Sequence, residues 1–148
     1  MKIKHFIRIK GPANCGKTAT VNWTFLKILK QKSSNLIKIK ATEGEDFIAL
    51  IDFKNVLLAF ISRGDSKECC EEDFDELSKF VKKDIDIIIF STRSRGGTVE
   101  FWNEKLQKNN KNAFDYILKN SHCEEEIFAY IKQQSQTLFN EIKKLTHF

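Results

Sequence analysis

Residues 11–18 of the chain read GPANCGKT. The stretch matches the pattern G-x-x-x-x-G-K-[ST] at every defined position. Before it, residues 3–9 largely alternate between apolar and polar side chains, which predicts a β-strand. After it, apolar residues recur at helical spacing over residues 21–29, which predicts an amphipathic helix starting at Gly16. The stretch is therefore predicted to join a strand directly to a helix.

The chemistry of this stretch is that of a cradle for phosphate. Its glycines let the backbone curl so that successive N–H groups point inward, and the helix N-terminus adds about half a positive charge at the same place. We expect Lys17 to reach the β- and γ-phosphates of a bound nucleotide and Thr18 to offer its hydroxyl to Mg²⁺. The residues expected to hold the nucleotide are Gly11, Pro12, Ala13, Asn14, Cys15, Gly16, Lys17, Thr18 and Ala19.

The motif in this context resembles the P-loop NTPase superfamily, as a small kinase-like or ATPase-like member. The resemblance rests on eight residues, and the strand–helix order described next extends it over most of the chain. It implies that ATP is bound together with Mg²⁺.

Strands and helices are predicted to alternate along the remaining sequence. Strands over residues 36–41, 47–53 and 56–62 are joined by two tight turns, which predicts an antiparallel meander. The later elements are a helix from Asp73, a strand over residues 85–90, a helix from Thr98 as N-cap, a strand over residues 113–118 and a long helix capped by Ser121 and Glu124. This order predicts a single α/β domain over residues 1–148. Its expected fold is a three-layer, P-loop NTPase-like one, with a mostly parallel sheet and one antiparallel strand.

A second anchor for the metal is expected from an acidic side chain at the end of another core strand. Asp52 ends an apolar strand, but in the predicted meander that strand runs away from residues 11–18. The next strand runs back, so Asp65 is predicted to lie on the nucleotide side and to bind the metal with Thr18. Three acids in the turn between the first two meander strands are the alternative, for the metal or for an acceptor group. They are Glu43, Glu45 and Asp46.

Arg93 and Arg95 follow the most apolar strand and precede Gly96 and Gly97. In open α/β sheets, ligands bind beyond the carboxyl ends of the strands, so both arginines are expected near residues 11–18. Guanidinium groups bind phosphate oxygens in bidentate fashion and stabilise charge in phosphoryl transfer. We predict Lys17, Arg93 and Arg95 as the catalytic set; the alternative is that both arginines are ordinary surface residues of a loop.

The composition of the chain indicates which partners and which cellular compartment to expect. The chain has 148 residues and a formal net charge of +5, with its lysines scattered, which favours either a solvated surface or a nucleic-acid partner. Four cysteines without a CxxC pair indicate reduced thiols and a cytoplasmic location. The first residues lack an apolar h-region and no stretch approaches 18 apolar residues, so we expect neither a signal peptide nor a membrane span.

These features predict an ATP-dependent phosphotransferase or ATPase acting with Mg²⁺ on a nucleotide, a nucleic acid or another phosphorylated acceptor. No guanine-reading N-K-x-D motif is present, since residues 109–112 read NNKN. The alternative is a nucleotide-dependent switch or assembly ATPase that acts through a protein partner. Extra aromatic residues on the final helix, Phe128, Phe139 and Phe148, predict a homo-oligomer or partner contact there. A third possibility is a binding module without turnover, suggested by the absence of an acid directly after Phe90.

Overall fold

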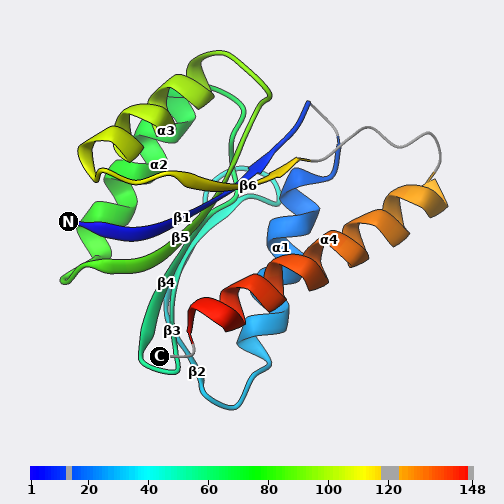
Figure 1. The fold of residues 1–148 in the computed structure, drawn as a ribbon, viewed down its shortest axis with the longest axis horizontal. Helices are drawn as coiled ribbons and strands as arrows, with labels where there is room; N and C mark the ends of the chain where they lie inside the picture. The colour runs from blue at the N-terminus through cyan, green and yellow to red at the C-terminus, as the bar shows by residue number, and fades with distance from the viewer. Residues whose placement is uncertain (13–14, 118–123, 147–148) are drawn as a thin grey trace.

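The structure is a computed structural model that describes residues 1–12, 15–117 and 124–146. The elements alternate in the predicted order. Their bounds are β1 Ile3–Lys10, α1 Lys17–Leu29, β2 Ser34–Ala41, β3 Phe47–Phe53, β4 Val56–Ile61, α2 Lys67–Phe80, β5 Ile85–Thr92, α3 Gly97–Lys108, β6 Ala113–Ile117 and α4 Glu124–Leu145. Figure 1 shows the strands crossing the centre of the molecule between two pairs of helices.

The six strands form one mixed sheet in the order β2-β3-β4-β5-β1-β6. β1 pairs in parallel with both β5 and β6, and β4 pairs in parallel with β5. β3 runs antiparallel to both of its neighbours, so it is the one strand that opposes the others. The predictions of an α/β fold, a mostly parallel sheet and an antiparallel meander are confirmed.

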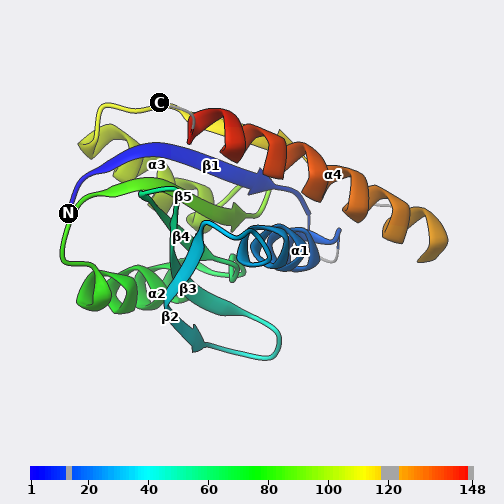
Figure 2. The same cartoon turned by 90° about the horizontal axis from the view of Figure 1, so that it is seen from below.

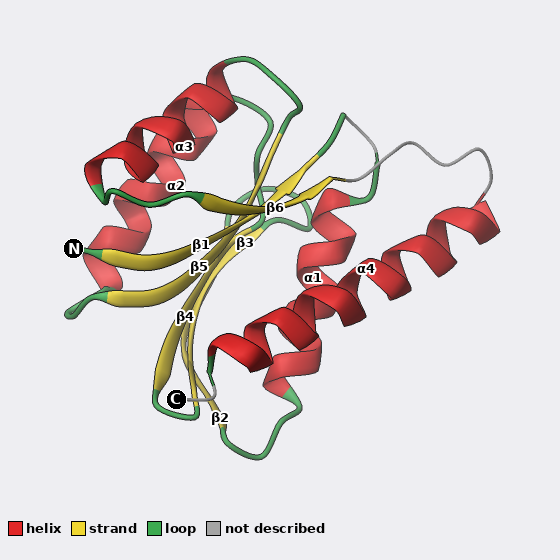
Figure 3. Cartoon of the chain, in the orientation of Figure 1, coloured by secondary structure: helices red, strands yellow, loops and turns green. Residues whose placement is uncertain are grey.

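Two helices cover each face of the sheet, which gives three layers (Figures 2 and 3). α1 and α4 lie against one face, where Phe25 and Phe60 are in edge-to-face contact. α2 and α3 lie against the other, where Trp102 stacks on Phe90 at 3.9 Å between ring centroids. The central strands are apolar on both faces because each face is covered, as expected for parallel sheets.

α2 begins six residues earlier than predicted. It starts at Lys67, and the Ser66 side chain caps it by accepting a hydrogen bond from the Cys69 N–H. The apolar pattern concealed this start because the first turn is charged and because a polar residue, Asp73, occupies a buried position between Cys70 and Leu77. The prediction of a helix opening at Asp73 is therefore wrong.

α4 lies along α1 and presents a mixed apolar stripe to the sheet. Ile131, Leu138 and Ile142 are buried, and Phe139 is buried with them. Phe128 is 57% exposed and makes an edge-to-face contact with Trp23 of α1. The proposed cap at Ser121 and the residue Phe148 lie outside the described residues. Within the described ranges, no helix combines the length and the apolar character needed to cross a membrane.

Candidate functional site

The carboxyl ends of β1, β4 and β5 meet at one edge of the sheet, which we call the ligand edge. There the Gly11 N–H donates to the Thr92 carbonyl at 3.2 Å, extending the pairing of β1 with β5. The connection from β1 then passes directly into α1, as predicted. Ala13 and Asn14 lie outside the described residues. In parallel sheets this edge is where ligands bind.

Gly16 closes the loop in a conformation that suits glycine. Its φ of +94° lies in the left-handed region, which side chains other than glycine rarely adopt. A Cβ placed on Gly16 would also lie 3.0 Å from the side chain of Ile131 in α4. The loop is thus closely covered by α4, and Cys15 beside it is buried in the core.

Lys17 is buried inside this loop, with only 8% of its surface exposed. Its Nζ donates to the carbonyl oxygens of Gly11 and Pro12, both at 2.8 Å. Burial lowers the pKa of Lys17, and the nearby Arg93 lowers it further, whereas Asp65 opposes the shift. Among the described residues, no carboxylate lies within ion-pair distance of this ammonium group. Within the described residues, Lys17 is therefore a buried cation whose hydrogen bonds go to neutral carbonyl oxygens.

Thr18 is joined to an acid from the β2–β3 turn. The Thr18 hydroxyl donates to Asp46 Oδ1 at 3.1 Å, and the Ser62 hydroxyl at the end of β4 donates to the same oxygen at 2.9 Å. The turn is closed by backbone hydrogen bonds, Asp46 N to Glu43 O at 2.8 Å and Thr42 N to Asp46 O at 3.0 Å. Asp46 therefore reaches Thr18 from a rigid hairpin.

Asp65, the acid favoured from the sequence, has a different partner. Its carboxylate lies 3.9 Å from Arg93 Nη2 and is largely exposed, and no hydrogen bond joins it to Thr18 within the described part of the chain. Asp52 lies at the far end of β3, as expected, where Oδ1 accepts from the Asn55 N–H at 3.0 Å. Asp46, and not Asp65, is therefore the acid that lies against the loop threonine.

The two arginines of the β5–α3 connection are placed differently. The Arg93 N–H donates to the Thr98 hydroxyl at 3.1 Å, and its Nε is buried without a hydrogen-bond partner among the described residues. Arg95 is exposed at the bend before α3. α3 begins at Gly97 after Gly96, without a side-chain cap, so the prediction of Thr98 as N-cap is wrong: its hydroxyl holds Arg93 instead.

Arg63 is a residue of this edge that the sequence patterns did not single out. Its guanidinium group binds Asp73 of α2 through two hydrogen bonds of 2.7 and 3.1 Å, and both residues are buried. It also reaches Glu43 of the β2–β3 turn at 3.3 Å. The hydrogen bonds to Asp73 raise the pKa of Arg63, while burial raises the pKa of Asp73 against the effect of Arg63. Arg63 therefore ties the hairpin that carries Asp46 to α2.

A signal for this pair was present in the sequence. Arg63 follows a fully apolar strand after one intervening serine, and Asp73 occupies a core-facing helix position, so both charged groups need a buried partner. Comparisons with models of protein families, with curated proteins and with solved structures gave no match. The functional assignment therefore rests on the geometry of the ligand edge.

Proposed function

We propose that this protein binds ATP with Mg²⁺ at the ligand edge and either hydrolyses it or transfers its γ-phosphate to a nucleotide or nucleic-acid-type acceptor. The fold we propose for it is that of the P-loop NTPases. The observation that carries the proposal is Lys17, a buried ammonium group inside a glycine-closed loop with no acidic partner within the described residues.

A buried cation without a counter-ion is costly unless an anion is bound. The carbonyl oxygens of Gly11 and Pro12 satisfy its donors but supply no negative charge. A phosphate group in the loop would supply that charge and would also accept from the N–H groups at the start of α1. The buried Nε of Arg93, which lacks a partner among the described residues, is a second donor available to the same ligand.

Thr18 and Asp46 fit Mg²⁺ because they place a hydroxyl and a carboxylate oxygen 3.1 Å apart. Mg²⁺ is usually held by one or two carboxylates together with phosphate oxygens and water. The described residues contain no cluster of three or more acidic, histidine or cysteine ligands, which agrees with a metal that enters with its nucleotide. When bound, Mg²⁺ would neutralise part of the phosphate charge.

The chain's own residues then have distinct roles. Lys17 would orient the β- and γ-phosphates, and Arg93 would stabilise the charge that spreads over the transferred phosphoryl group. Arg95 is exposed and is assigned to the acceptor rather than to the nucleotide. We propose ATP over GTP because residues 109–112 lack the guanine-reading motif and belong to the opposite edge of the sheet.

Titration calorimetry with ATP and Mg²⁺ tests the proposal directly. Lys17→Ala should lose most of the affinity of the parent protein, because it removes the buried cation. The matched control is Lys30→Ala, an exposed lysine beyond the other end of α1. Equal affinity of Lys17→Ala and the parent would refute the phosphate site. With labelled ATP, label on an added nucleotide or oligonucleotide indicates a kinase, free phosphate an ATPase, and neither a binding module.

One observation favours the alternative of a nucleotide-dependent switch acting through a protein partner. The Ile131 side chain lies 3.0 Å from the position that a Cβ on Gly16 would take, so movement of Gly16 would be passed to α4. α4 carries the exposed Phe128, one of the three aromatic residues for which a partner or homo-oligomer contact was predicted, whereas Phe139 is buried within the chain. Light scattering in the presence and absence of ATP separates the two: only the switch predicts a nucleotide-dependent change in assembly.

A further inference from the structure

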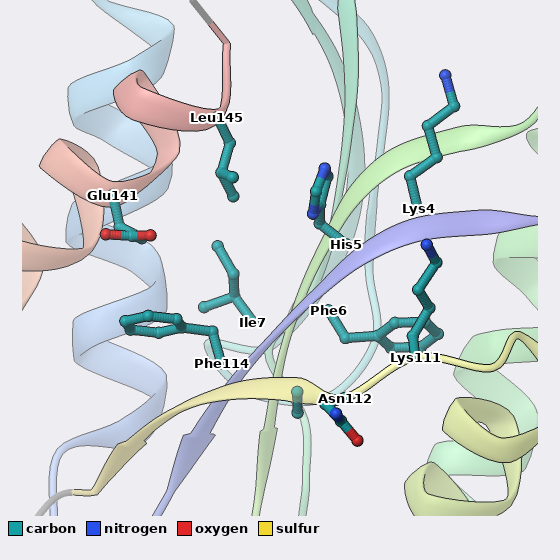
Figure 4. A pocket seen from close by; sticks show the side chains of 10 residues that line it. Lys4, His5, Phe6, Ile7, Lys111, Asn112, Phe114, Glu141 and Leu145 are labelled. Atoms are coloured by element: carbon teal, nitrogen blue, oxygen red, sulfur yellow. The ribbon is translucent and has the colours of Figure 1, made fainter.

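A second candidate site lies at the opposite edge of the sheet, where β1 begins and the α3–β6 connection ends. Two adjoining hollows of about 340 and 360 Å³ are present there, and both are lined by Lys4 and Lys111. We call them together the lysine groove. Its basic side chains are Lys2, Lys4, Lys108 and Lys111. Figure 4 shows the first hollow, between β1, β6 and the end of α4.

The local backbone fixes the rim of this groove. α3 ends at Lys108 with Asn109 as its C-cap, and Asn110 adopts a left-handed conformation with φ of +52°. The Lys111 N–H then donates back to the Leu106 carbonyl at 3.0 Å, which closes the helix end. The Asn109 side chain accepts from the Ile3 N–H at 3.0 Å, so the connection is fastened to the first strand. Lys108 and Lys111 therefore project from an ordered backbone.

The electrostatic balance of the groove is positive. Lys4 is neutralised by Asp86 at 3.0 Å, but within the described ranges no carboxylate lies within ion-pair distance of Lys2, Lys108 or Lys111. The acidic residues that line the two hollows are Asp84 and Glu141.

His5 lies in the first hollow, near two of these lysines. Burial lowers the pKa of His5, and Lys111 and Lys4 lower it further, against Asp86. A site with this field favours a ligand that carries several negative charges.

The first hollow is also lined by the aromatic ring of Phe114. Phe114 lies on β6, the edge strand, and is 48% exposed while it lines the first hollow. Its ring lies 5.2 Å from that of Tyr116 on the same strand. In Figure 4 the Phe114 side chain borders the hollow beside Ile7, facing the end of α4. Phe114 thus shares the first hollow with Lys4 and Lys111, and Lys2 and Lys108 line the adjoining second hollow.

We propose that the lysine groove binds single-stranded nucleic acid. Lys2, Lys108 and Lys111 contact backbone phosphates, and Phe114 stacks with an unpaired base that enters the hollow. Single-strand binding sites combine a basic track for the backbone with aromatic rings for the bases. A duplex keeps its bases stacked inside and would engage the lysines alone, so the exposed ring favours a single strand.

The groove is a different site from the ligand edge. Lys2, Lys4 and Lys111 lie beside the start of β1, whereas residues 11–18 follow its other end, and the eight residues of β1 span about 26 Å. Phe114 lies between these ends, opposite Ile7. Nucleic acid in the groove would therefore leave room for a nucleotide at residues 11–18, and the proposal does not depend on ATP binding.

Fluorescence anisotropy with a labelled oligothymidylate of about 15 nucleotides tests the proposal. Lys108→Glu/Lys111→Glu should weaken binding by at least about 10-fold, because it reverses two phosphate contacts. The matched control is Lys30→Glu/Lys32→Glu, two exposed lysines near β2 at the other end of the strand order, with an identical change in net charge. Phe114→Ala should weaken single-strand binding about 10-fold and leave binding of the same-length duplex unchanged.

Two results would overturn the proposal. The first is an equal loss of affinity in the groove variant and its control, which would show general charge attraction. The second is tighter binding of the duplex, with no effect of Phe114→Ala. Lys17→Ala should retain oligonucleotide binding, so failure of the ATP proposal and failure of this one are distinguishable.

Discussion

The two ends of the parallel strands both carry basic side chains, but they hold them in opposite ways. At the ligand edge, Lys17 is 8% exposed and is bound to two backbone carbonyls. At the lysine groove, the Lys4 side chain is 62% exposed, and Lys108 and Lys111 are exposed as well. The hydrogen bonds at the ligand edge hold the Lys17 ammonium group in one position. The lysine side chains of the groove are instead exposed to water.

The contribution of a single charged residue to ligand binding is therefore expected to differ between the two edges. Charges in a buried site are weakly screened by salt. Exposed charges are screened by salt and substitute for one another, so individual contributions are small. We therefore expect large effects of single substitutions at the ligand edge and only cumulative, salt-dependent effects at the groove.

The largest effect is expected for Arg93. Arg93→Ala should lower the turnover of ATP about 10³-fold with little loss of ATP affinity, because a transition-state arginine acts mainly on the developing charge. Arg95→Ala should instead raise the apparent KM for the acceptor. Steady-state kinetics paired with calorimetry measures both. Unchanged turnover in Arg93→Ala would show that the charged residues of the ligand edge substitute for one another, as is expected for those of the lysine groove.

The next effect concerns stability at the ligand edge. A Cβ on Gly64 would overlap the Ser91 carbonyl group, and the Ser91 hydroxyl already donates to Ser62 O at 2.6 Å. Gly64→Ala should therefore lower the free energy of unfolding by about 2 to 3 kcal/mol in urea titrations.

The control for Gly64→Ala is a glycine with open space around it. Gly44 has a φ of +57°, and no heavy atom lies within 4 Å of the position that a Cβ would take there. Gly44→Ala should therefore cost only about 1 kcal/mol, from its backbone conformation alone. Equal losses in the two variants would contradict the close approach of β4 and β5 at this edge.

The third effect separates the two acids. Asp46→Asn keeps an acceptor for Thr18 and Ser62 but removes the negative charge, so the fold should be retained. The gain in ATP affinity that Mg²⁺ provides should fall about 10- to 100-fold. Asp65→Asn should leave that gain unchanged. Calorimetry with and without Mg²⁺ decides between them, and a loss in Asp65→Asn alone would restore the assignment made from the sequence.

The smallest expected effect is the difference in salt dependence between the edges. Three phosphate contacts in the groove predict a log–log slope of about −2, or roughly a 20-fold loss of oligonucleotide affinity between 50 and 200 mM salt. ATP affinity should fall by a smaller factor, because Lys17 is buried and weakly screened. Parallel titrations by anisotropy and calorimetry measure both slopes. Equal slopes would contradict the expectation that salt screens the buried Lys17 less than it screens the exposed lysines of the groove.

The prediction of the fold succeeded where the pattern was local and failed where a polar residue replaced an apolar one. Alternation along β1 and the two tight turns around β3 were sufficient to predict the element order and the meander. The start of α2 was missed because Asp73 faces the core with Arg63 as its partner. A pattern of apolar residues cannot report a buried ion pair.

The element order and the position of residues 11–18 between β1 and α1 could be predicted from the sequence, because these depend on contacts between near neighbours along the chain. The mostly parallel sheet joins strands that are far apart in sequence, and it was predicted from the alternation of strands and helices by the general rule for such folds. That Asp46, and not Asp65, reaches the Thr18 hydroxyl could be seen only in the tertiary structure. The same holds for the contact of Arg63 that ties the hairpin to α2. The tertiary structure also brought Lys2, Lys108, Lys111 and Phe114 to one groove. Such sites join residues far apart in sequence, and their meeting depends on strand order and helix packing, which no local pattern encodes.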